Sequence, residues 1–120
     1  MGTTRRLREL NSQIRCISFQ PDSSFHGLEG LKHMATAIVP SIYDPKLADE
    51  NLAVSTEDAH RMVKRLALEE GILAGVSAGA AVCASFEVAR HLPGNQRAVI
   101  VTVFPDSGEK YLSEKFWSEA

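Results

Sequence analysis

The segment from Gly75 to Ala80 constrains the fold of this chain more than any other. It reads Gly-Val-Ser-Ala-Gly-Ala and joins an apolar run with the pattern of a buried strand, residues 72–76, to a helix start made of small residues. This order places the hydroxyl of Ser77 at the edge of a sheet beside a helix N-terminus, where ligands are commonly held. The segment therefore predicts a binding site at the edge of an α/β sheet.

A second polar turn follows another apolar run. Residues 98–104 have the composition of a strand, and the turn 105–108, Pro-Asp-Ser-Gly, comes directly after them. Between the two runs a helix is predicted over 78–92, ending before a Pro-Gly-Asn breaker. A strand–helix–strand unit crosses over right-handedly, so the two strands should be parallel. Ser77 and the turn 105–108 should then border one crevice.

The clearest helix signal lies between these motifs and the N-terminus. The helix predicted over 56–70 has Ser55 as its N-cap, an apolar stripe at helical spacing, and Gly71 at the position that suits a left-handed C-terminal residue. The other predicted elements are a short basic helix over 4–10, a strand over 14–19, a loop-rich excursion over 25–45 and a short strand over 52–54. Strands and helices alternate, which predicts the α/β class.

Composition limits the classes of partner. At 120 residues with 44% hydrophobic and 23% charged residues and a net charge of −2, the chain has the size of one domain and no basic field for nucleic acid. No apolar run approaches the roughly 20 residues that cross a membrane, and no signal-peptide pattern is present. Cys16 and Cys83 lie in apolar runs without metal-ligand spacing, which favours reduced, buried thiols and a cytoplasmic location.

Several residues invite other interpretations. Gly75-x-Ser77-x-Gly79 matches a hydrolase nucleophile elbow, but the only later histidine, His91, is 14 positions along the same helix, about 20 Å away. Ser77 could instead only cap the helix, and the turn 105–108 could be only a turn. His26, Lys32 and His33 could serve a metal or acid–base role, although such loop residues are more often simply exposed.

Two longer stretches carry a family resemblance. Residues 69–80, Glu-Glu-Gly-Ile-Leu-Ala-Gly-Val-Ser-Ala-Gly-Ala, and residues 105–113, Pro-Asp-Ser-Gly-Glu-Lys-Tyr-Leu-Ser, resemble the C-terminal part of the cysteine synthase family. This family comprises pyridoxal-phosphate-dependent enzymes of fold type II. The resemblance runs from Gly2 to about Trp117. It implies a three-layer sandwich with a mainly parallel sheet, in which residues 1–120 form a single partial domain, the C-terminal part of the large cofactor-binding domain.

The resemblance also implies roles for individual residues. Ser77 corresponds to the serine that hydrogen-bonds the pyridine nitrogen of the cofactor, with Gly75 beside it. Pro105, Asp106 and Ser107 correspond to the turn that borders the pyridine ring. The loop 25–31 resembles the family's substrate-side loop, in which Gly30 matches the pocket glycine. A hydroxyl, unlike a carboxylate, does not keep the pyridine nitrogen protonated, and this suits β-elimination and replacement.

One departure from the family is large. Family members carry an N-terminal Schiff-base lysine, a substrate loop and a phosphate cradle, whereas residues 1–9 resemble the helix that follows the cradle. The five lysines of the chain, Lys32, Lys46, Lys64, Lys110 and Lys115, lie in segments that match other parts of the family. The chain is therefore expected to be a C-terminal fragment that neither holds pyridoxal phosphate nor catalyses the reaction by itself.

The implied reaction of the complete enzyme is β-replacement on an activated serine with a sulfur nucleophile, which makes cysteine. The sequence leaves the activated serine and the sulfur donor open. Missing sheet neighbours predict an exposed edge and an apolar patch, and hence a homodimer or an N-terminal fragment as partner. The alternative is a truncated binding module, derived from this family, that has lost catalysis and pairs with the intact enzyme.

Overall fold

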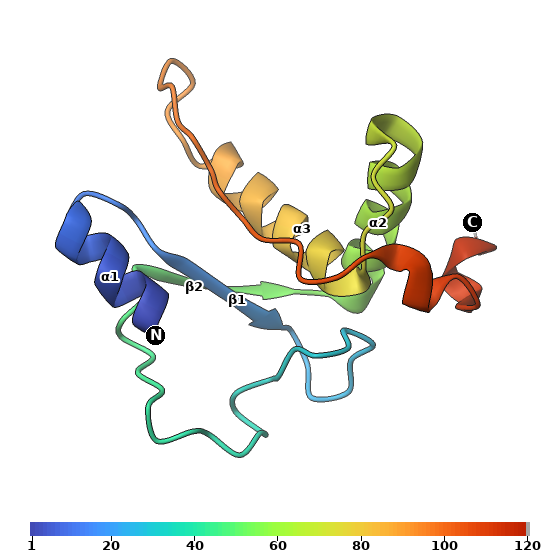
Figure 1. Ribbon diagram of the computed structural model, residues 1–120, viewed down its shortest axis with the longest axis horizontal. Coiled ribbons are helices and arrows are strands. Elements are labelled where there is room, and N and C mark those ends of the chain that lie inside the picture. The colour runs from blue at the N-terminus through green and yellow to red at the C-terminus, as the bar shows by residue number, and fades with distance from the viewer. Residues whose placement is uncertain (120) are drawn as a thin grey trace.

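The computed structural model describes residues 1–119, and Figure 1 shows the order of their elements. In chain order these are α1 (Gly2–Leu10), β1 (Ile17–Pro21), β2 (Glu50–Val54), α2 (Thr56–Glu70), α3 (Val76–Arg90) and the 3-10 turns η1 (Gly108–Tyr111) and η2 (Lys115–Trp117). The strands β1 and β2 lie between α1 at one end and the pair α2 and α3 at the other. None of the helices within this range is long and apolar enough to cross a membrane.

The strands β1 and β2 form a parallel pair. The register runs from Ile17 opposite Glu50 to Pro21 opposite Val54. The connection over 22–49 contains no helix or strand, as the predicted loop-rich excursion requires. Parallel pairing and flanking helices agree with the predicted α/β class.

The helices α2 and α3 pack closely against each other. Ser55 Oγ accepts a hydrogen bond from the N–H of Asp58 at 3.1 Å, and Gly71 ends α2 with a φ of 68°, so both predicted caps are confirmed. Gly79 of α3 faces α2, because a Cβ there would lie 2.4 Å from the carbonyl oxygen of Ala59 and 2.6 Å from Val63 Cγ2. Only glycine permits this approach, and it brings the start of α3 into the core.

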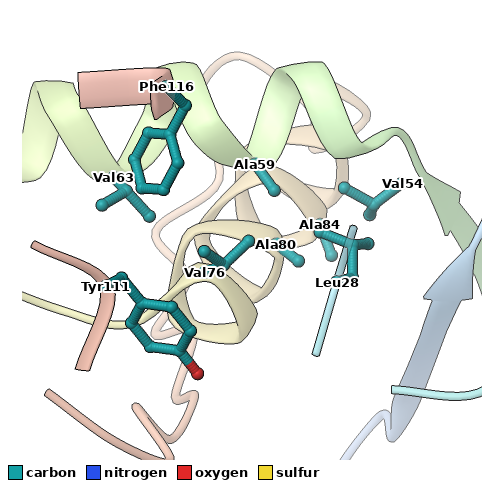
Figure 2. Close-up of a cluster of buried hydrophobic side chains, with 9 residues drawn as sticks. All are labelled: Leu28, Val54, Ala59, Val63, Val76, Ala80, Ala84, Tyr111 and Phe116. Atoms are coloured by element: carbon teal, nitrogen blue, oxygen red, sulfur yellow. The ribbon is translucent and has the colours of Figure 1, made fainter. Parts of the chain in front are cut away.

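One buried cluster joins segments that are far apart in the sequence (Figure 2). It draws on the loop after β1, the end of β2, the helices α2 and α3, and the two 3-10 turns; its members are Leu28, Val54, Ala59, Val63, Val76, Ala80, Ala84, Tyr111 and Phe116. His60 of α2 stacks on Phe116 with ring centroids 4.2 Å apart. The C-terminal turns are therefore packed onto the helix pair.

Two predicted strands are wrong for this chain. Residues 72–76 make only one isolated bridge, Ala74 to Ser107, which is antiparallel, and residues 98–104 form no strand. The sequence pattern of both segments is that of a buried strand, but a strand also needs a hydrogen-bonded neighbour. Within residues 1–119 the strand-like pairing of 72–76 is limited to this bridge with residues 106–108, and no backbone hydrogen bond joins 98–104 to a neighbour. Most of the apolar side chains of 98–104 are correspondingly exposed.

The two cysteines also differ from their prediction in one respect. Both are free thiols, as expected, but each is only partly buried. Burial of the Cys83 side chain nevertheless raises the pKa of its thiol to about 11. At neutral pH Cys83 is therefore a protonated, unreactive thiol on the side of α3.

Candidate functional site

The structure brings the two predicted motifs together at the start of α3. The N–H of Gly75 donates to the carbonyl oxygen of Asp106 at 3.1 Å, and the N–H of Gly108 donates to the carbonyl oxygen of Leu73 at 3.1 Å. The bridge between Ala74 and Ser107 lies between these two bonds. The turn 105–108 is thus fixed beside the strand-to-helix turn, although by an antiparallel bridge and not by the predicted parallel pairing.

Gly75 is required by the close approach of the turn. A Cβ at this position would lie 1.9 Å from Asp106 Oδ1, 2.7 Å from Asp106 Cγ and 3.0 Å from Tyr111 Cε2. Any larger residue would therefore displace the Asp106 carboxylate. The glycine predicted from the motif is needed here for space, since its φ of −74° is open to other residues.

Asp106 is held from the other side by Tyr111. The Tyr111 hydroxyl donates to Asp106 Oδ2 at 2.8 Å, and this hydrogen bond, together with burial, raises the pKa of the tyrosine to about 12. Trp117 Nε1 donates to the carbonyl oxygen of Tyr111 at 2.7 Å and ties η2 to the same place. The second carboxylate oxygen, Asp106 Oδ1, is buried without a hydrogen-bond partner among the described residues.

Ser77 is the one buried polar residue of the core among residues 1–119, with 7% of its surface exposed. It is the second residue of α3, and the N-cap is Gly75, so the interpretation of Ser77 as a helix cap is wrong. Its hydroxyl forms no hydrogen bond to another described residue, and it is not among the fully buried polar atoms that lack a partner, so the oxygen retains some access to solvent. A partly accessible hydroxyl without a protein partner in the first turn of a helix can donate a hydrogen bond to a ligand atom.

The other predicted site residues lie around this point. Pro105 and Ser107 are exposed at the turn. Gly30, with a φ of 81°, lies in the loop after β1, next to Glu29, whose charge contributes to the raised pKa of Tyr111. The side chain of Leu28 packs in the same cluster as Tyr111 (Figure 2). The structure shows no contact between Gly30 and the described residues of the turn 105–108, since a Cβ at Gly30 would have nothing within 4 Å.

Two hollows occur elsewhere on the surface. One, of about 350 Å³, lies in the loop after β1 and includes His26, Lys32 and His33 in its lining. The other, of about 620 Å³, lies between α2 and α3 and includes Cys83. Neither is lined by the predicted cofactor residues, and within residues 1–119 no group of three or more potential ligands is placed to hold a metal ion.

The hydrolase alternative fails on geometry. Ser77 lies in the first turn of α3, whereas His91 follows its last residue, and fourteen residues of helix separate them by about 21 Å. His91 is exposed, and its Nδ1 lies 2.8 Å from the carbonyl oxygen of Glu87. This pair cannot transfer a proton, so it does not form a nucleophile and base.

Comparison with known proteins shows the family to which the chain belongs. The model of a family described as "Pyridoxal-phosphate dependent enzyme" matches residues 1–106. The chain therefore belongs to the family of pyridoxal-phosphate-dependent enzymes. Within that family, its relatives include several cysteine synthases, and its structural neighbours include O-acetylserine sulfhydrylases of fold type II.

Individual relatives give the extent of the similarity. A cysteine synthase of Aquifex aeolicus is 46% identical over 120 residues, which cover 99% of this chain and 37% of that protein. Cysteine synthase B of Salmonella typhimurium is 34% identical over 98% of this chain and 38% of its own length. The crystal structure of a cysteine synthase from Entamoeba histolytica matches 99% of this chain and 37% of its own with a TM-score of 0.88 at 30% identity. The chain thus spans less than two fifths of the length of each of these three relatives.

Tyr111 is the residue of the site that the sequence did not single out. It belongs to the recognised motif, but its contact with Asp106 depends on the way η1 folds back onto the core. The only available signal was its position five residues after Asp106 in a segment rich in turn formers. That signal does not distinguish a buried tyrosine from an exposed one.

Proposed function

We propose that this chain forms one wall of the cofactor site of a cysteine-synthase-like enzyme, in which the hydroxyl of Ser77 hydrogen-bonds the pyridine nitrogen of pyridoxal phosphate. The observation that carries the proposal is the hydroxyl of Ser77, which has no protein partner and lies beside a turn that is hydrogen-bonded to the residues just before α3. When bound, pyridoxal phosphate supplies an electron sink for cleavage of bonds at the substrate's α-carbon.

The residues of this wall fit such a group. Ser77 offers a donor to a ring nitrogen without supplying a charge that would keep the nitrogen protonated. Because Gly75 has no side chain, the Asp106 carboxylate fits beside it, and the Tyr111 hydroxyl donates to this carboxylate from the opposite side. Pro105 and Ser107, exposed on the same turn, are proposed to border the ring. We assign Gly75, Ser77, Pro105, Asp106 and Ser107 to the cofactor wall, and Gly30 to the substrate side.

The reaction of the complete enzyme is, on this proposal, replacement of the β-substituent of an activated serine by a sulfur nucleophile to give cysteine. The support comes from relatives named cysteine synthase, with up to 46% identity among those cited. Another relative, from Streptomyces lavendulae, is named O-ureido-L-serine synthase and is 33% identical over 121 residues. The sulfur donor and the activated serine therefore need direct measurement.

The 120-residue chain alone is proposed to be inactive. Its lysines do not lie in a segment that resembles the Schiff-base segment of the family, and the chain covers 37% of the Aquifex enzyme. The aldehyde anchor and the phosphate donors of a complete site would come from the rest of the fold. Purified chain incubated with pyridoxal phosphate should therefore show no bound-cofactor absorbance and no cysteine synthesis.

A chimera tests the role of Ser77. The 120 residues replace the aligned segment of the Aquifex cysteine synthase, and cofactor affinity and cysteine formation are measured. We expect an active enzyme in which Ser77→Ala weakens cofactor binding by about tenfold, the effect of one lost hydrogen bond. Ser85→Ala is the matched control, because the Ser85 hydroxyl donates to the carbonyl oxygen of Ala81 on the same helix at 2.8 Å. Equal cofactor affinity in the two variants would contradict the assignment.

A further inference from the structure

The Asp106 carboxylate lies at the N-terminus of α3, where the side chain of an N-cap residue normally lies. The N-cap of α3 is Gly75, and a Cβ built on it would be 1.9 Å from Asp106 Oδ1 and 2.7 Å from Asp106 Cγ. An N-cap side chain places its oxygen beside the first turn of the helix, but glycine has no side chain, and no side-chain hydrogen bond caps α3. Asp106 Oδ1 therefore occupies, from the turn 105–108, the place of an N-cap oxygen.

The carboxylate is fixed at this place without a cationic partner. The carbonyl oxygen of Asp106 accepts from the N–H of Gly75 at 3.1 Å, and its Oδ2 accepts from the Tyr111 hydroxyl at 2.8 Å. In Figure 2 the Tyr111 ring lies beside Val76, the first residue of α3. Within residues 1–119 Asp106 takes part in no ion pair, and its Oδ1 has no hydrogen-bond partner. No neighbouring cation therefore offsets its charge.

Other charges around the start of α3 are few. None of residues 71–86 carries a charged side chain, so the approach to α3 and its first turns are uncharged. Glu29, in the loop after β1, adds a second negative charge on the side of η1. Glu109 and Lys110 of η1 are exposed and of opposite sign, and solvent screens such charges. The carboxylate of Asp106 is thus the charge held closest to the first turn of α3.

Two opposing electrostatic effects meet at Ser77. The N-terminus of a helix carries a partial positive charge, which disfavours protonation of a base bound there. Ser77 lies two residues after Gly75, roughly 3 Å further along the helix axis, so a group bound by its hydroxyl also lies in the field of Asp106. A negative charge near a base favours its protonated form. The carboxylate therefore offsets the effect of the helix at the position where a ligand meets Ser77.

We propose that the Asp106 carboxylate sets the basicity of a ring nitrogen held by Ser77, by offsetting the positive end of α3. Asp106 neither contacts the nitrogen nor accepts its proton, which exchanges with solvent. It acts through space and makes protonation of the nitrogen more favourable. A protonated ring withdraws electrons more strongly than a neutral one, so this residue would tune the cofactor as an electron sink. The inference rests on the proposed function, because it needs a ring nitrogen at Ser77.

The test uses the chimera described above, loaded with pyridoxal phosphate that is isotope-labelled at the ring nitrogen. The nitrogen resonance is followed by NMR as a function of pH, which reports protonation directly and not activity. Asp106→Asn keeps the shape and an acceptor for Tyr111 but removes the charge. We expect the midpoint of the titration to fall by about one pH unit in this variant. Glu109→Gln is the matched control, because it removes the same charge from an exposed position on η1, and it should leave the midpoint unchanged.

A second measurement needs neither the chimera nor the cofactor. In the 120-residue chain alone, removal of a charge at the N-terminus of α3 changes the electric field at the first N–H groups of the helix. We expect the amide resonances of Val76 and Ser77 to shift at neutral pH in Asp106→Asn and to stay in place in Glu109→Gln. An unchanged position of both resonances in Asp106→Asn would overturn the proposal, whether or not the chimera binds pyridoxal phosphate.

The results in the chimera separate this inference from the function on which it rests. A midpoint that is the same with Asp106 and with Asn at this position would overturn the inference, and so would an equal shift in the Asp106→Asn and Glu109→Gln variants. Tenfold weaker cofactor binding in Ser77→Ala together with equal midpoints would leave the proposed function standing and remove only the role of Asp106. Equal affinity of Ser77→Ala and Ser85→Ala would instead contradict the proposed function, and the inference would fall with it.

Discussion

The hydrogen bond between Tyr111 and Asp106 should be a main support of the turn that borders the site. Tyr111→Phe removes the donor to Asp106 Oδ2, and Oδ1 already has no partner within residues 1–119. Both carboxylate oxygens would then lie without a protein donor. Hydrogen bonds to charged groups contribute about 1.5–3 kcal/mol, so we expect the free energy of unfolding to fall by about that amount.

The chain provides its own control for this substitution. Its only other tyrosine, Tyr43, lies in the loop between β1 and β2, and its hydroxyl forms no hydrogen bond in the described structure. Tyr43→Phe should therefore change the free energy of unfolding by less than about 0.5 kcal/mol. Denaturant unfolding of the two variants and the wild type measures both effects. Equal stability of the two variants would refute the structural role given to Tyr111.

The pH dependence of the same variant supplies a second check. The raised pKa of Tyr111, about 12 against a usual value of 10, means that the folded state favours the neutral phenol. This contribution is fully present below pH 10 and is lost as the pH rises toward 12. The stability difference between wild type and Tyr111→Phe should therefore narrow over that window. A difference that stays constant from pH 9 to pH 12 would mean that the phenol is not coupled to the carboxylate.

Further substitutions test the close contact at Gly75 and the buried side chain of His60. Gly75→Ala should destabilise the chain by about 1–3 kcal/mol in denaturant unfolding because it displaces the Asp106 carboxylate, whereas Gly94→Ala, with open space around it, should not. The variant that combines Gly75→Ala with Tyr111→Phe should lose less free energy of unfolding than the sum of the two single losses. Strict additivity of the two losses would count against a shared contact. His60 has a pKa lowered by burial, so stability should fall as the pH drops below about 6.5, and His60→Phe should lose this dependence in the same titration.

The sequence-based predictions are accurate where the structure depends on residues close together in the sequence, and they fail where it depends on distant residues. The helix over 56–70 was predicted with its observed bounds because Ser55 and Gly71 are local signals. The following helix was placed two residues too late, since the small residues after Gly75 did not reveal that Val76 is already helical. The strand predictions for 72–76 and 98–104 failed because the local sequence pattern does not show whether a segment has hydrogen-bonded neighbours on both sides.

The predictions for the site divide in the same way between local and long-range interactions. The sequence predicted that Ser77 and the turn 105–108 meet, and the structure bears this out through the Gly75–Asp106 hydrogen bond. The parallel pairing invoked for that meeting is wrong. The role of Tyr111 cannot be predicted from the sequence, because it depends on the packing of η1 and η2 against α2. Roles assigned through the family resemblance remain proposals for the chimera to decide.

This division has a consequence for how a complete site would assemble. Helices satisfy their backbone groups internally, and α2 and α3 pack against each other at Gly79 and Ala59 and share a buried cluster with Val54 of β2. The proposed cofactor wall consists of the first turn of α3 and a turn fixed by Gly75, Asp106 and Tyr111, all within this chain. The proposed wall at Ser77 is therefore formed by contacts among residues 73–111 and does not depend on pairing of 98–104.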